Sequence, residues 1–342
     1  MFPALAVADR LRSQGTEVFW LGTRRGMEAA IVPAHGLRME WIEVQGLRGN
    51  GLRRWLAAPY RIGRAVFESI RILRHNRPTA VLGMGGFVAG PGGVASRLLG
   101  VPLVIHEQNA LAGMTNRWLA RIASRVMAAF PGALPGAEVC GNPVRDEILA
   151  LPGPESRFAG RGGRLRLLVL GGSQGAQALN ALVPQALAAL PEKRRPEVLH
   201  QAGQRNIEQA RMAYDAAGVT ARVEPFIDDM AAAYGWADLV LCRAGALTVA
   251  ELAGVGVGAI LVPYPYAVDD HQTRNAAYLT DAGAALLIPE SELSLEVLRD
   301  RLEPLLDDRD RLLEMARRAR DLARPEATER LAGVCLEVSR DG

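Results

Sequence analysis

Cysteine is scarce in this sequence. Its 342 residues include three cysteines, Cys140, Cys242 and Cys335, which lie far apart in the chain. Their odd number and wide spacing exclude a disulfide framework, and no pair has the spacing of a zinc-binding motif. We therefore predict reduced, buried thiols, as in cytosolic proteins.

Long apolar runs, strong net charge and the dinucleotide fingerprint are also absent. No run approaches the length of a membrane span, and the opening MFPALAVA lacks the basic region of a signal peptide. A formal net charge of +3 excludes a polycation of the kind that binds nucleic acid, so we expect no nucleic-acid partner. Without a G-x-G-x-x-G motif and its acidic partner, an NAD(P)-dependent dehydrogenase is disfavoured.

What the sequence contains instead is an alternation of strand-like and helix-like segments. The strand-like runs are short and apolar without a period of two, which is typical of parallel strands buried on both faces. They occupy 80–86, 102–108, 165–172, 238–245 and 259–265. Helical patterns lie between them, at 113–122, 175–190, 246–255 and 270–282. This order predicts an α/β protein with doubly wound parallel sheets.

A change in composition divides the chain at LPGPESRFAGRGGR (151–164), which is rich in Pro, Gly and Arg and has no apolar period. Such segments are typical of domain boundaries. We expect one domain over 1–150, a linker over 151–163 and a second domain over 164–325. The remaining residues, 326–342, show a helical pattern, and we expect this helix to return to the first domain.

The stretch LVLGGSQGAQALN (168–180) combines the end of a strand, a glycine-rich turn and the start of a helix. Backbone N–H groups at such a turn, with the helix dipole behind them, favour a phosphate. Ser173 adds a hydroxyl donor. The alternative is a tight turn that serves only the packing of helix on strand, and the motif alone leaves both interpretations open.

A second stretch, CRAGALTVAEL (242–252), repeats this design. Gly245 and residues 246–248 place small side chains and backbone amides at a helix N-terminus. Glu251 follows closely, which is unusual beside a diphosphate unless the carboxylate binds another group, such as a ribose diol. The alternative is that Glu251 only complements the helix dipole.

In YPYAVDDHQTRNAAYL (264–279) a strand ends and another helix begins. Three polar side chains are expected at the carboxyl edge of the sheet, where ligands bind in open α/β sheets. They are His271, Gln272 and Asn275. Asp269 or Asp270 can cap the helix, and this role is favoured over a metal site because two carboxylates and one histidine lack a second ligand cluster.

The first half has polar residues in comparable places. HEQNALAGMTN (106–116) sets His106, Glu107, Gln108 and Asn109 at the end of a strand, and GNPVR (141–145) ends with Arg145, which suits an anionic group. A lone histidine after a strand is more often a hydrogen-bonded structural residue than a base.

The segment 47–78 holds eight arginines against one acid, Glu68, with aromatic and aliphatic residues interleaved. A basic helix of this type can lie on an anionic lipid surface. The alternative is an ordinary amphipathic helix that packs on the sheet and leaves its arginines solvated.

Six stretches of the sequence, in their order and spacing, resemble the MurG family of glycosyltransferase family 28. They are HEQN, GNPVR, GGSQGAQALN, FIDDMAAAY, CRAGALTVAEL and DDHQTRNA, and the resemblance extends over essentially the whole chain. It implies a GT-B fold, in which two Rossmann-like doubly wound parallel-sheet domains face each other across a cleft. It also implies UDP-GlcNAc as donor and lipid I, undecaprenyl-pyrophosphoryl-MurNAc-pentapeptide, as acceptor.

The implied reaction is an inverting, metal-independent transfer of GlcNAc to the MurNAc 4-hydroxyl of lipid I, without a cofactor. It gives lipid II and UDP in peptidoglycan synthesis, and so serves cell-wall biogenesis, cell shape and cell division. The implied location is peripheral, on the cytoplasmic face of the bacterial inner membrane. Anionic lipid would be bound through 47–78, and cell-wall synthesis proteins are further expected partners.

The resemblance also implies residue roles. Ile227 would contact uracil through its backbone, Glu251 would hold the ribose hydroxyls, and Gln272 would contact the sugar. The diphosphate would lie against Ser173 and the amides of 246–248, while Asn109 and Arg145 would close the cleft from the first half. The implied donor-binding residues are Asn109, Arg145, Ser173, Ile227, Ala246, Leu247, Thr248, Val249, Ala250, Glu251 and Gln272, with Gly172, Gln174 and Asn275 as further contacts.

The sequence departs from the family pattern at two places. Gly258 stands where the family usually has proline, which should matter little. Family members also begin with a strand and a GGTGGH loop before VFPALAVA, whereas here FPALAVA follows Met1 and the opening helix has neither an N-cap nor a preceding strand. We expect Met1 to represent a GTG-encoded valine, with the true start upstream. That loop carries the histidine implied as general base, so His106 is the nearest remaining candidate.

Two other functions stay open from the sequence. UDP-GlcNAc 2-epimerases share the implied fold and donor but need no lipid-facing basic helix. A truncated protein that binds UDP-sugar without turnover is the non-enzymatic alternative.

Overall fold

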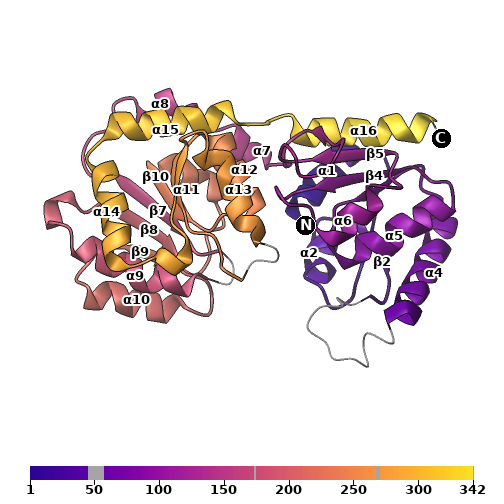
Figure 1. Cartoon of the computed structure of the whole chain (residues 1–342), viewed down its shortest axis with the longest axis horizontal. Helices are drawn as coiled ribbons and strands as arrows, with labels where there is room; N and C mark the ends of the chain where they lie inside the picture. The colour runs from indigo at the N-terminus through magenta and orange to yellow at the C-terminus, as the bar shows by residue number, and fades with distance from the viewer. Residues whose placement is uncertain (45–57, 173–174, 267–269, 342) are drawn as a thin grey trace. The chain divides into compact units, whose positions relative to one another are not determined.

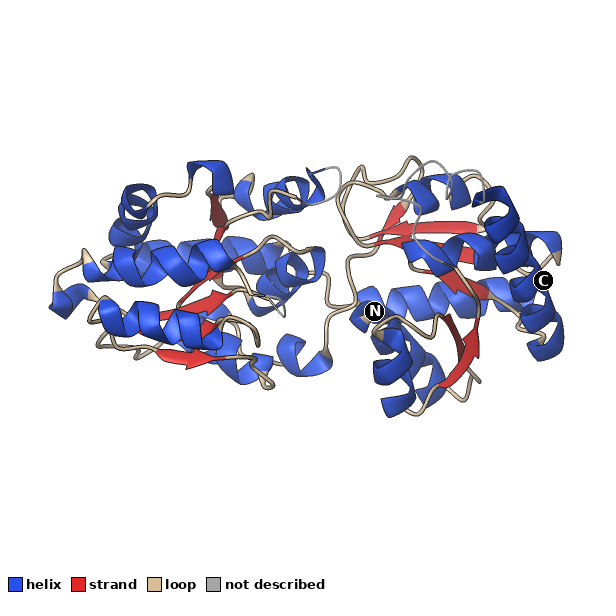
Figure 2. Ribbon diagram, turned by 90° about the horizontal axis from the view of Figure 1, so that it is seen from below, coloured by secondary structure: helices blue, strands red, loops and turns tan. Residues whose placement is uncertain are grey.

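The computed structural model describes residues 1–44, 58–172, 175–266 and 270–341 (Figure 1). The chain forms two compact units. Unit 1 comprises Met1–Pro143 and Glu326–Gly342, and unit 2 comprises Val144–Pro325. The division thus precedes the segment whose composition suggested a linker, and 151–163 belongs to unit 2. Each unit has parallel strands (red in Figure 2) with helices packed on them.

Unit 2 is built on a six-stranded sheet with the order β12-β11-β10-β7-β8-β9, and every neighbouring pair is parallel. β7 and β10, the first and fourth strands of unit 2 along the chain, lie side by side at the centre of the sheet. The chain therefore winds outward from them in both directions, as a doubly wound sheet requires. The strands are β7 (Arg166–Leu170), β8 (Glu197–Gln201), β9 (Arg222–Glu224), β10 (Leu239–Cys242), β11 (Gly258–Leu261) and β12 (Ala285–Leu287).

The helices of unit 2 cover the sheet and bury its apolar strands. β10 and β11 are buried along their whole length, which explains their runs of apolar residues without alternation. The helices are α7 (Asp146–Leu149), α8 (Pro154–Phe158), α9 (Gln177–Ala188), α10 (Ile207–Ala216), α11 (Met230–Trp236), α12 (Ala246–Val255), α13 (His271–Thr280), α14 (Leu295–Leu306) and α15 (Arg309–Asp321), with short 3-10 turns at Glu192–Arg194 and Glu290–Glu292.

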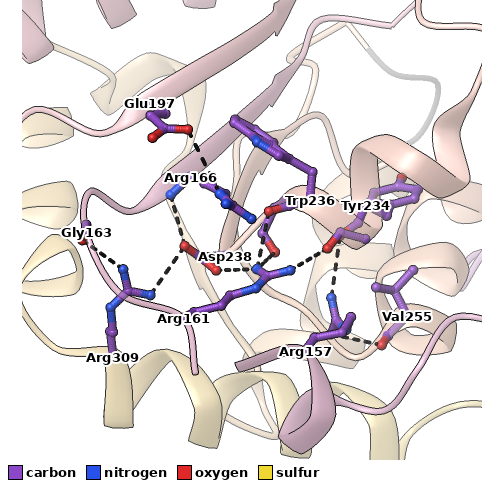
Figure 3. Close-up of polar contacts among 12 residues, drawn as sticks. Arg157, Arg161, Gly163, Arg166, Glu197, Tyr234, Trp236, Asp238, Val255 and Arg309 are labelled. Carbon is purple, nitrogen blue, oxygen red and sulfur yellow. Dashed lines mark hydrogen bonds and ion pairs between the residues drawn. The ribbon is translucent and has the colours of Figure 1, made fainter. Parts of the chain in front are cut away.

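The segment 151–163 is fastened to unit 2 by two arginines (Figure 3). Arg157, on α8, donates to Val255 O (3.1 Å), to Gly256 O and to Tyr234 O (3.4 Å). A cation at the last carbonyls of α12 complements the negative end of that helix. Burial lowers the pKa of Arg157 to about 10, so its guanidinium keeps its charge near neutral pH.

Arg161 continues this attachment. It donates to the carbonyl of Gly235 (2.5 Å) and forms an ion pair with Asp238, whose side chain is 1% exposed. The other carboxylate oxygen of Asp238 accepts from Arg166 N (3.0 Å) and faces Arg309 at 3.5 Å. One buried carboxylate therefore joins the segment before β7, the start of β7 and the start of α15.

Replacing Asp238 by asparagine should lower the free energy of unfolding by about 3–5 kcal/mol, because two arginines would lose the buried carboxylate that faces them. Urea unfolding measures this change. Glu208→Gln is the control, since its pair with Arg211 is exposed and should contribute about 1 kcal/mol or less. Equal effects of the two substitutions would contradict the structural role of Asp238.

Unit 1 holds two parallel sheets in its described residues. β1 (Phe19–Gly22) pairs with β2 (Arg38–Trp41), and a second sheet has the order β3-β4-β5-β6. Its strands are β3 (Val81–Gly83), β4 (Leu103–Glu107), β5 (Arg125–Ala128) and β6 (Glu138–Val139). The helices are α1 (Phe2–Ser13), α2 (Glu28–Ala34), α4 (Ala58–Asn76), α5 (Gly86–Leu98), α6 (Met114–Leu119) and α16 (Ala327–Asp341).

The C-terminal helix α16 completes the core of unit 1. It packs against α1, and its residues Leu331, Val334 and Val338 share a buried cluster with Val7 and Leu11. The two ends of the chain therefore lie in the same unit (Figure 1).

The three cysteines are free and buried, as predicted. Burial raises the pKa of the Cys140 thiol to about 11 and those of Cys242 and Cys335 to about 12. Because the thiolate is the reactive form, these side chains act as small apolar groups in the core.

Candidate functional site

The centre of the unit 2 sheet positions the candidate site. β7 and β10 lie next to each other in parallel register, and the chain turns away from them in opposite directions. Open α/β sheets bind ligands at the carboxyl ends of strands at this switch in strand order. The two glycine-containing stretches of the sequence, after β7 and after β10, both leave the sheet at this place.

Two glycines of the turn after β7, Gly171 and Gly175, leave no room for a side chain. A Cβ atom on Gly171 would lie 2.9 Å from Gln201 O and 2.8 Å from Ala176 N. Gly175 has φ +77°, and a Cβ there would lie 2.3 Å from Ala202 O. Gly172 also has a positive φ of +75°. The turn therefore packs directly against the main chain after β8, whereas Ser173 and Gln174 lie outside the described residues.

The turn after β10 presents the N-terminus of α12. Gly245 is the N-cap, and the helical ladder begins where Val249 N donates to Gly245 O (2.9 Å). Ala246, Leu247 and Thr248 precede that bond, as the first three residues of the helix. An N-terminus of this kind carries about half a positive charge and suits a phosphate. Ala250, one residue beyond Val249, is half-buried.

Val249 lies just inside the N-terminus of α12. Its side chain is completely buried and its amide is used by the helix. The side chain of Val249 thus lies in the core of unit 2, and its role as a donor contact stays a prediction from the resemblance.

Glu251 lies one turn into α12 and is held from two sides. Its Oε2 accepts from the Tyr234 hydroxyl (3.0 Å), and its Oε1 accepts from Arg145 Nη2 (3.3 Å). The carboxylate side chain is 9% exposed. Burial raises the pKa of Glu251, and the Arg145 charge and the Tyr234 hydrogen bond oppose that rise.

Two features of this arrangement were not predicted from the sequence. Arg145 is the N-cap of α7 and lies in unit 2, not in the first half to which it was assigned. Tyr234, on α11, is the last residue of FIDDMAAAY, but no sequence pattern predicts its contact with Glu251. The hydroxyl of a buried tyrosine usually finds a partner, which is the one hint the sequence offered.

The end of β11 and the start of α13 carry the remaining polar residues. Gln272 Oε1 accepts from Tyr264 N (2.9 Å), which ties α13 to the end of the strand. Asn275 is buried and donates to Ala244 O (3.2 Å), so its position is structural. Asp270 is the N-cap of α13, yet its carboxylate accepts from the Thr273 hydroxyl (2.7 Å) rather than from a backbone amide. Asp269 lies outside the described residues.

Ile227 lies between β9 and α11. Its side chain is buried, which leaves the main chain as the part able to meet a ligand. Asp229 caps α11 by accepting from Ala232 N (2.8 Å) and so fixes the direction in which this helix leaves the loop.

In unit 1, His106 has no exposed surface. Gln108 Nε2 donates to His106 Nδ1 (3.0 Å), so Nε2 carries the proton and donates to Gly141 O (2.9 Å). Burial lowers the pKa of His106 to about 4. Both ring nitrogens are used within unit 1, and this geometry argues against His106 as the general base.

Acid should destabilise the protein through this histidine. The folded pKa of about 4 lies below the ordinary 6.5, so the unfolded chain binds the proton first and stability falls as pH drops from 6.5 toward 4. The slope for one such group is about 1.4 kcal/mol per pH unit. Urea unfolding at pH 7 and pH 5 measures it, and His106→Gln should show a smaller difference between the two. The buried His200 contributes in the same direction and stays in both proteins. An unchanged difference in His106→Gln would contradict this assignment.

Asn109 follows β4, the strand that contains His106, and is held by Glu107. Glu107 Oε1 accepts from Asn109 N (3.0 Å) and Nδ2 (3.3 Å), while Oε2 accepts from Asn116 Nδ2 (2.8 Å) and Gly113 N (3.2 Å). A buried carboxylate thus fixes the loop that carries Asn109. His106 and Asn109 belong to unit 1, whereas the other described site residues belong to unit 2.

Unit 1 also exposes an apolar and basic surface. α5 packs against both α4 and α6 (Figure 1). Each of the three helices bears exposed apolar side chains. Phe67 is 61% exposed and Trp118 is 63% exposed. The apolar members are Tyr60, Ile62, Phe67, Phe87, Val94, Leu98, Met114 and Trp118, with Arg61, Arg71, Arg74, Arg97, Arg117 and Arg121 exposed on the same helices or just after them. We call these residues the α4–α6 surface. Of the segment 47–78, residues 47–57 lie outside the described part.

The described residues contain neither a group of potential metal ligands nor a helix suited to span a membrane. Within 1–44, 58–172, 175–266 and 270–341, no three histidine, cysteine, aspartate or glutamate side chains are grouped as metal ligands. In the same ranges, no helix combines the length and the apolar character needed to cross a bilayer.

Comparison with known proteins gives a consistent picture. Residues 1–128 match the glycosyltransferase family 28 N-terminal domain, and residues 166–331 match the glycosyltransferase family 28 C-terminal domain. A curated protein of Alkalilimnicola ehrlichii is 60% identical over 99% of this chain and 96% of its own length. One of Marinobacter nauticus is 56% identical over 99% of this chain and 94% of its own.

Both of these proteins are named UDP-N-acetylglucosamine–N-acetylmuramyl-(pentapeptide) pyrophosphoryl-undecaprenol N-acetylglucosamine transferase. Among solved structures, MurG of Acinetobacter baumannii matches with a TM-score of 0.88 and 45% identity, over 98% of this chain and 95% of that one. The expected GT-B fold of two Rossmann-like domains is confirmed by these matches together with the parallel sheets of the two units.

Proposed function

Because the chain belongs to glycosyltransferase family 28, we propose that it transfers GlcNAc from UDP-GlcNAc to lipid I and so makes lipid II for peptidoglycan. The observation that carries this proposal is the design of α12 in unit 2. One helix presents N-terminal amides suited to a diphosphate and, one turn later, a buried carboxylate suited to a ribose. Both groups stand at the switch in strand order.

The donor is proposed to bind along this edge of unit 2. The diphosphate lies against Gly172, Ser173 and Gln174 and the amides of Leu247 and Thr248, while Glu251 accepts hydrogen bonds from the ribose. The main chain at Ile227 contacts uracil. Gln272 has its amide nitrogen available for the sugar, since its oxygen is bound to Tyr264 N. Asn109 and Arg145 supply further donor contacts.

The reaction is proposed to be a single inverting displacement. The MurNAc 4-hydroxyl attacks the anomeric carbon of GlcNAc in line with the leaving UDP, through an oxocarbenium-like transition state. Negative charge grows on the diphosphate as the bond breaks, and the α12 N-terminus stabilises that charge. Because a helix N-terminus can do this without a cation, we propose metal-independent transfer. The 4-hydroxyl passes its proton to a general base as the new bond forms.

Dependence of UDP release on the acceptor tests the reaction class. We expect UDP to appear from UDP-GlcNAc only when a lipid I analogue is added, and at an unchanged rate in EDTA. UDP release or UDP-ManNAc formation without acceptor would favour the isomerase. UDP binding without any turnover would favour a non-catalytic sugar-nucleotide-binding protein, and loss of transfer in EDTA would overturn metal independence.

The α4–α6 surface is proposed to rest on the anionic membrane that carries lipid I. Its exposed aromatic and aliphatic side chains would enter the headgroup region, and its arginines would face lipid phosphates. We therefore propose a peripheral protein at the cytoplasmic face of the inner membrane, with cell-wall synthesis proteins as further partners.

Replacing Phe67 and Trp118 together by serine should weaken binding to anionic phospholipid vesicles by at least about tenfold, because each buried apolar side chain contributes about 1.5–3 kcal/mol. Vesicle co-sedimentation measures the change. Met212→Ser, at a 70% exposed methionine on α10 of unit 2, is the control and should bind normally. Equal binding of the double variant and the unmodified protein would contradict this surface.

A further inference from the structure

The carboxylate of Glu251 is held in place by a tyrosine that itself has no exposed surface. Tyr234 lies on α11, and its hydroxyl donates to Glu251 Oε2 at 3.0 Å. Arg145 Nη2 approaches the other oxygen, Oε1, at 3.3 Å. Each carboxylate oxygen therefore has one partner from the protein.

We propose that Tyr234 is a positioning residue for nucleotide-sugar binding, which fixes the Glu251 carboxylate so that its remaining lone pairs face the two ribose hydroxyls. This inference rests on the proposed ribose-binding role of Glu251. Tyr234 acts through Glu251 and does not touch the ligand.

The hydrogen-bonding capacity of the carboxylate fits this role. An ionised carboxylate has about four acceptor positions, two on each oxygen. Tyr234 and Arg145 occupy one position on each oxygen, so one position on each oxygen remains. Two adjacent acceptors match the two adjacent hydroxyls of a ribose and match a deoxyribose less well.

Tyr234 remains a donor over the whole working pH range. Its burial and the facing charge of Glu251 hold the pKa of the phenol well above its ordinary value. The hydroxyl therefore keeps its proton and donates it to Glu251, which remains the acceptor for the ribose hydroxyls. A phenylalanine would fill the same volume, so packing alone does not require the oxygen.

Arg157 fixes the two helices that carry this pair (Figure 3). Its guanidinium donates to Tyr234 O (3.4 Å) and to Val255 O (3.1 Å). Tyr234 is on α11 and Val255 is the last residue of α12, the helix of Glu251. One buried cation thus sets the spacing of the tyrosine and glutamate helices.

The charged and titratable groups around Glu251 come from several elements. Arg145 and Glu147 lie at α7, Tyr234 on α11, and Cys242 at the end of β10. Arg145 and Tyr234 favour the ionised form of Glu251, and Glu147 opposes it. Removal of the Tyr234 hydroxyl should therefore raise the pKa of Glu251 further and move the acidic loss of UDP binding to higher pH.

The test compares the affinities of UDP, 2′-deoxy-UDP and 2′,3′-dideoxy-UDP for the full chain, by calorimetry. The unmodified protein should prefer UDP. Tyr234→Phe should reduce the preference for UDP over dideoxy-UDP about fivefold or more, with little change in dideoxy-UDP affinity. Tyr214→Phe is the matched control, since it removes another buried phenol of unit 2, which is bonded to His200 (2.9 Å), and should keep the full preference.

The outcomes separate this inference from the proposed function. Equal affinities of the three nucleotides for the unmodified protein would refute the ribose role of Glu251 itself. A normal preference in the unmodified protein that survives unchanged in Tyr234→Phe would refute the positioning role and leave the ribose role intact. If Tyr234→Phe fails to fold, 3-fluorotyrosine at position 234 replaces it. Its stronger hydroxyl donor should move the acidic loss of UDP binding to lower pH, and an unchanged pH profile would refute the positioning role.

Discussion

Glu251→Ala should reduce kcat/KM for UDP-GlcNAc by about 100-fold or more, because each hydrogen bond to a charged group contributes about 1.5–3 kcal/mol and two ribose hydroxyls would lose theirs. The substitution also leaves the Arg145 guanidinium and the buried Tyr234 hydroxyl without the carboxylate that they face. Steady-state transfer assays at varied UDP-GlcNAc measure the effect. Glu251→Gln keeps the shape of the side chain without its charge. Its kcat/KM should lie between those of Glu251→Ala and the unmodified protein.

The control for this prediction is Glu208→Ala. Glu208 belongs to unit 2, but its side chain is 77% exposed and pairs only with another exposed side chain, Arg211, in the structure described. It should keep full activity. Activity of Glu251→Ala within threefold of the unmodified protein would contradict the site, since no donor contact of that strength could then involve Glu251.

Gly175→Ala should destabilise unit 2 by about 2 kcal/mol or more and weaken UDP binding at least tenfold. A Cβ atom at this position would lie 2.3 Å from Ala202 O, and φ is +77°. Both the steric contact and the left-handed backbone oppose a side chain, and each such source of strain costs about 1–3 kcal/mol. The turn must shift, and with it the backbone groups proposed to hold the diphosphate.

Substitutions at two other glycines distinguish the effect of the steric contact from that of the left-handed backbone. Gly218 has a φ of +60° and open space around its Cβ position, so Gly218→Ala should cost only the backbone strain and leave UDP affinity unchanged. Gly162 has neither constraint, and Gly162→Ala should be neutral. Urea unfolding and calorimetry with UDP measure both quantities. If Gly175→Ala bound UDP normally, the turn would serve packing alone, the alternative that its sequence left open.

Periodicity predicted most of the fold because the central strands of unit 2 are buried on both faces. The expected helix at 246–255 is α12, and the expected strands at 165–172 and 238–245 contain β7 and β10. Gly245 marked the start of α12, since it ends the strand pattern and occupies the N-cap. Local patterns could not indicate that the described strands of unit 1 fall into two sheets, because pairing joins segments distant in the chain.

The segment 151–163 shows where composition misleads. Pro, Gly and Arg suggested a linker, but Arg157 and Arg161 are held by main-chain carbonyls of unit 2. An arginine that binds carbonyls and one that faces water are identical in sequence. Their difference arises only when the helix end and the loop that offer those carbonyls are folded.

The site was predictable in part for similar reasons. Glycines at the ends of β7 and β10 indicated a ligand edge, because parallel strands bring those ends together. The Tyr234–Glu251 contact joins two helices and had no local pattern, and the burial of His106 depends on the distant Gly141 carbonyl. Ser173 and Gln174, outside the described residues, stay predictions.

The most direct measurement is transfer of labelled GlcNAc from UDP-GlcNAc to a lipid I analogue by this chain, with mass and linkage analysis of the product. The account predicts a product heavier by one GlcNAc, joined to the MurNAc 4-hydroxyl with inverted anomeric configuration. Labelled UDP-ManNAc, or no labelled acceptor despite tight UDP binding, would contradict it.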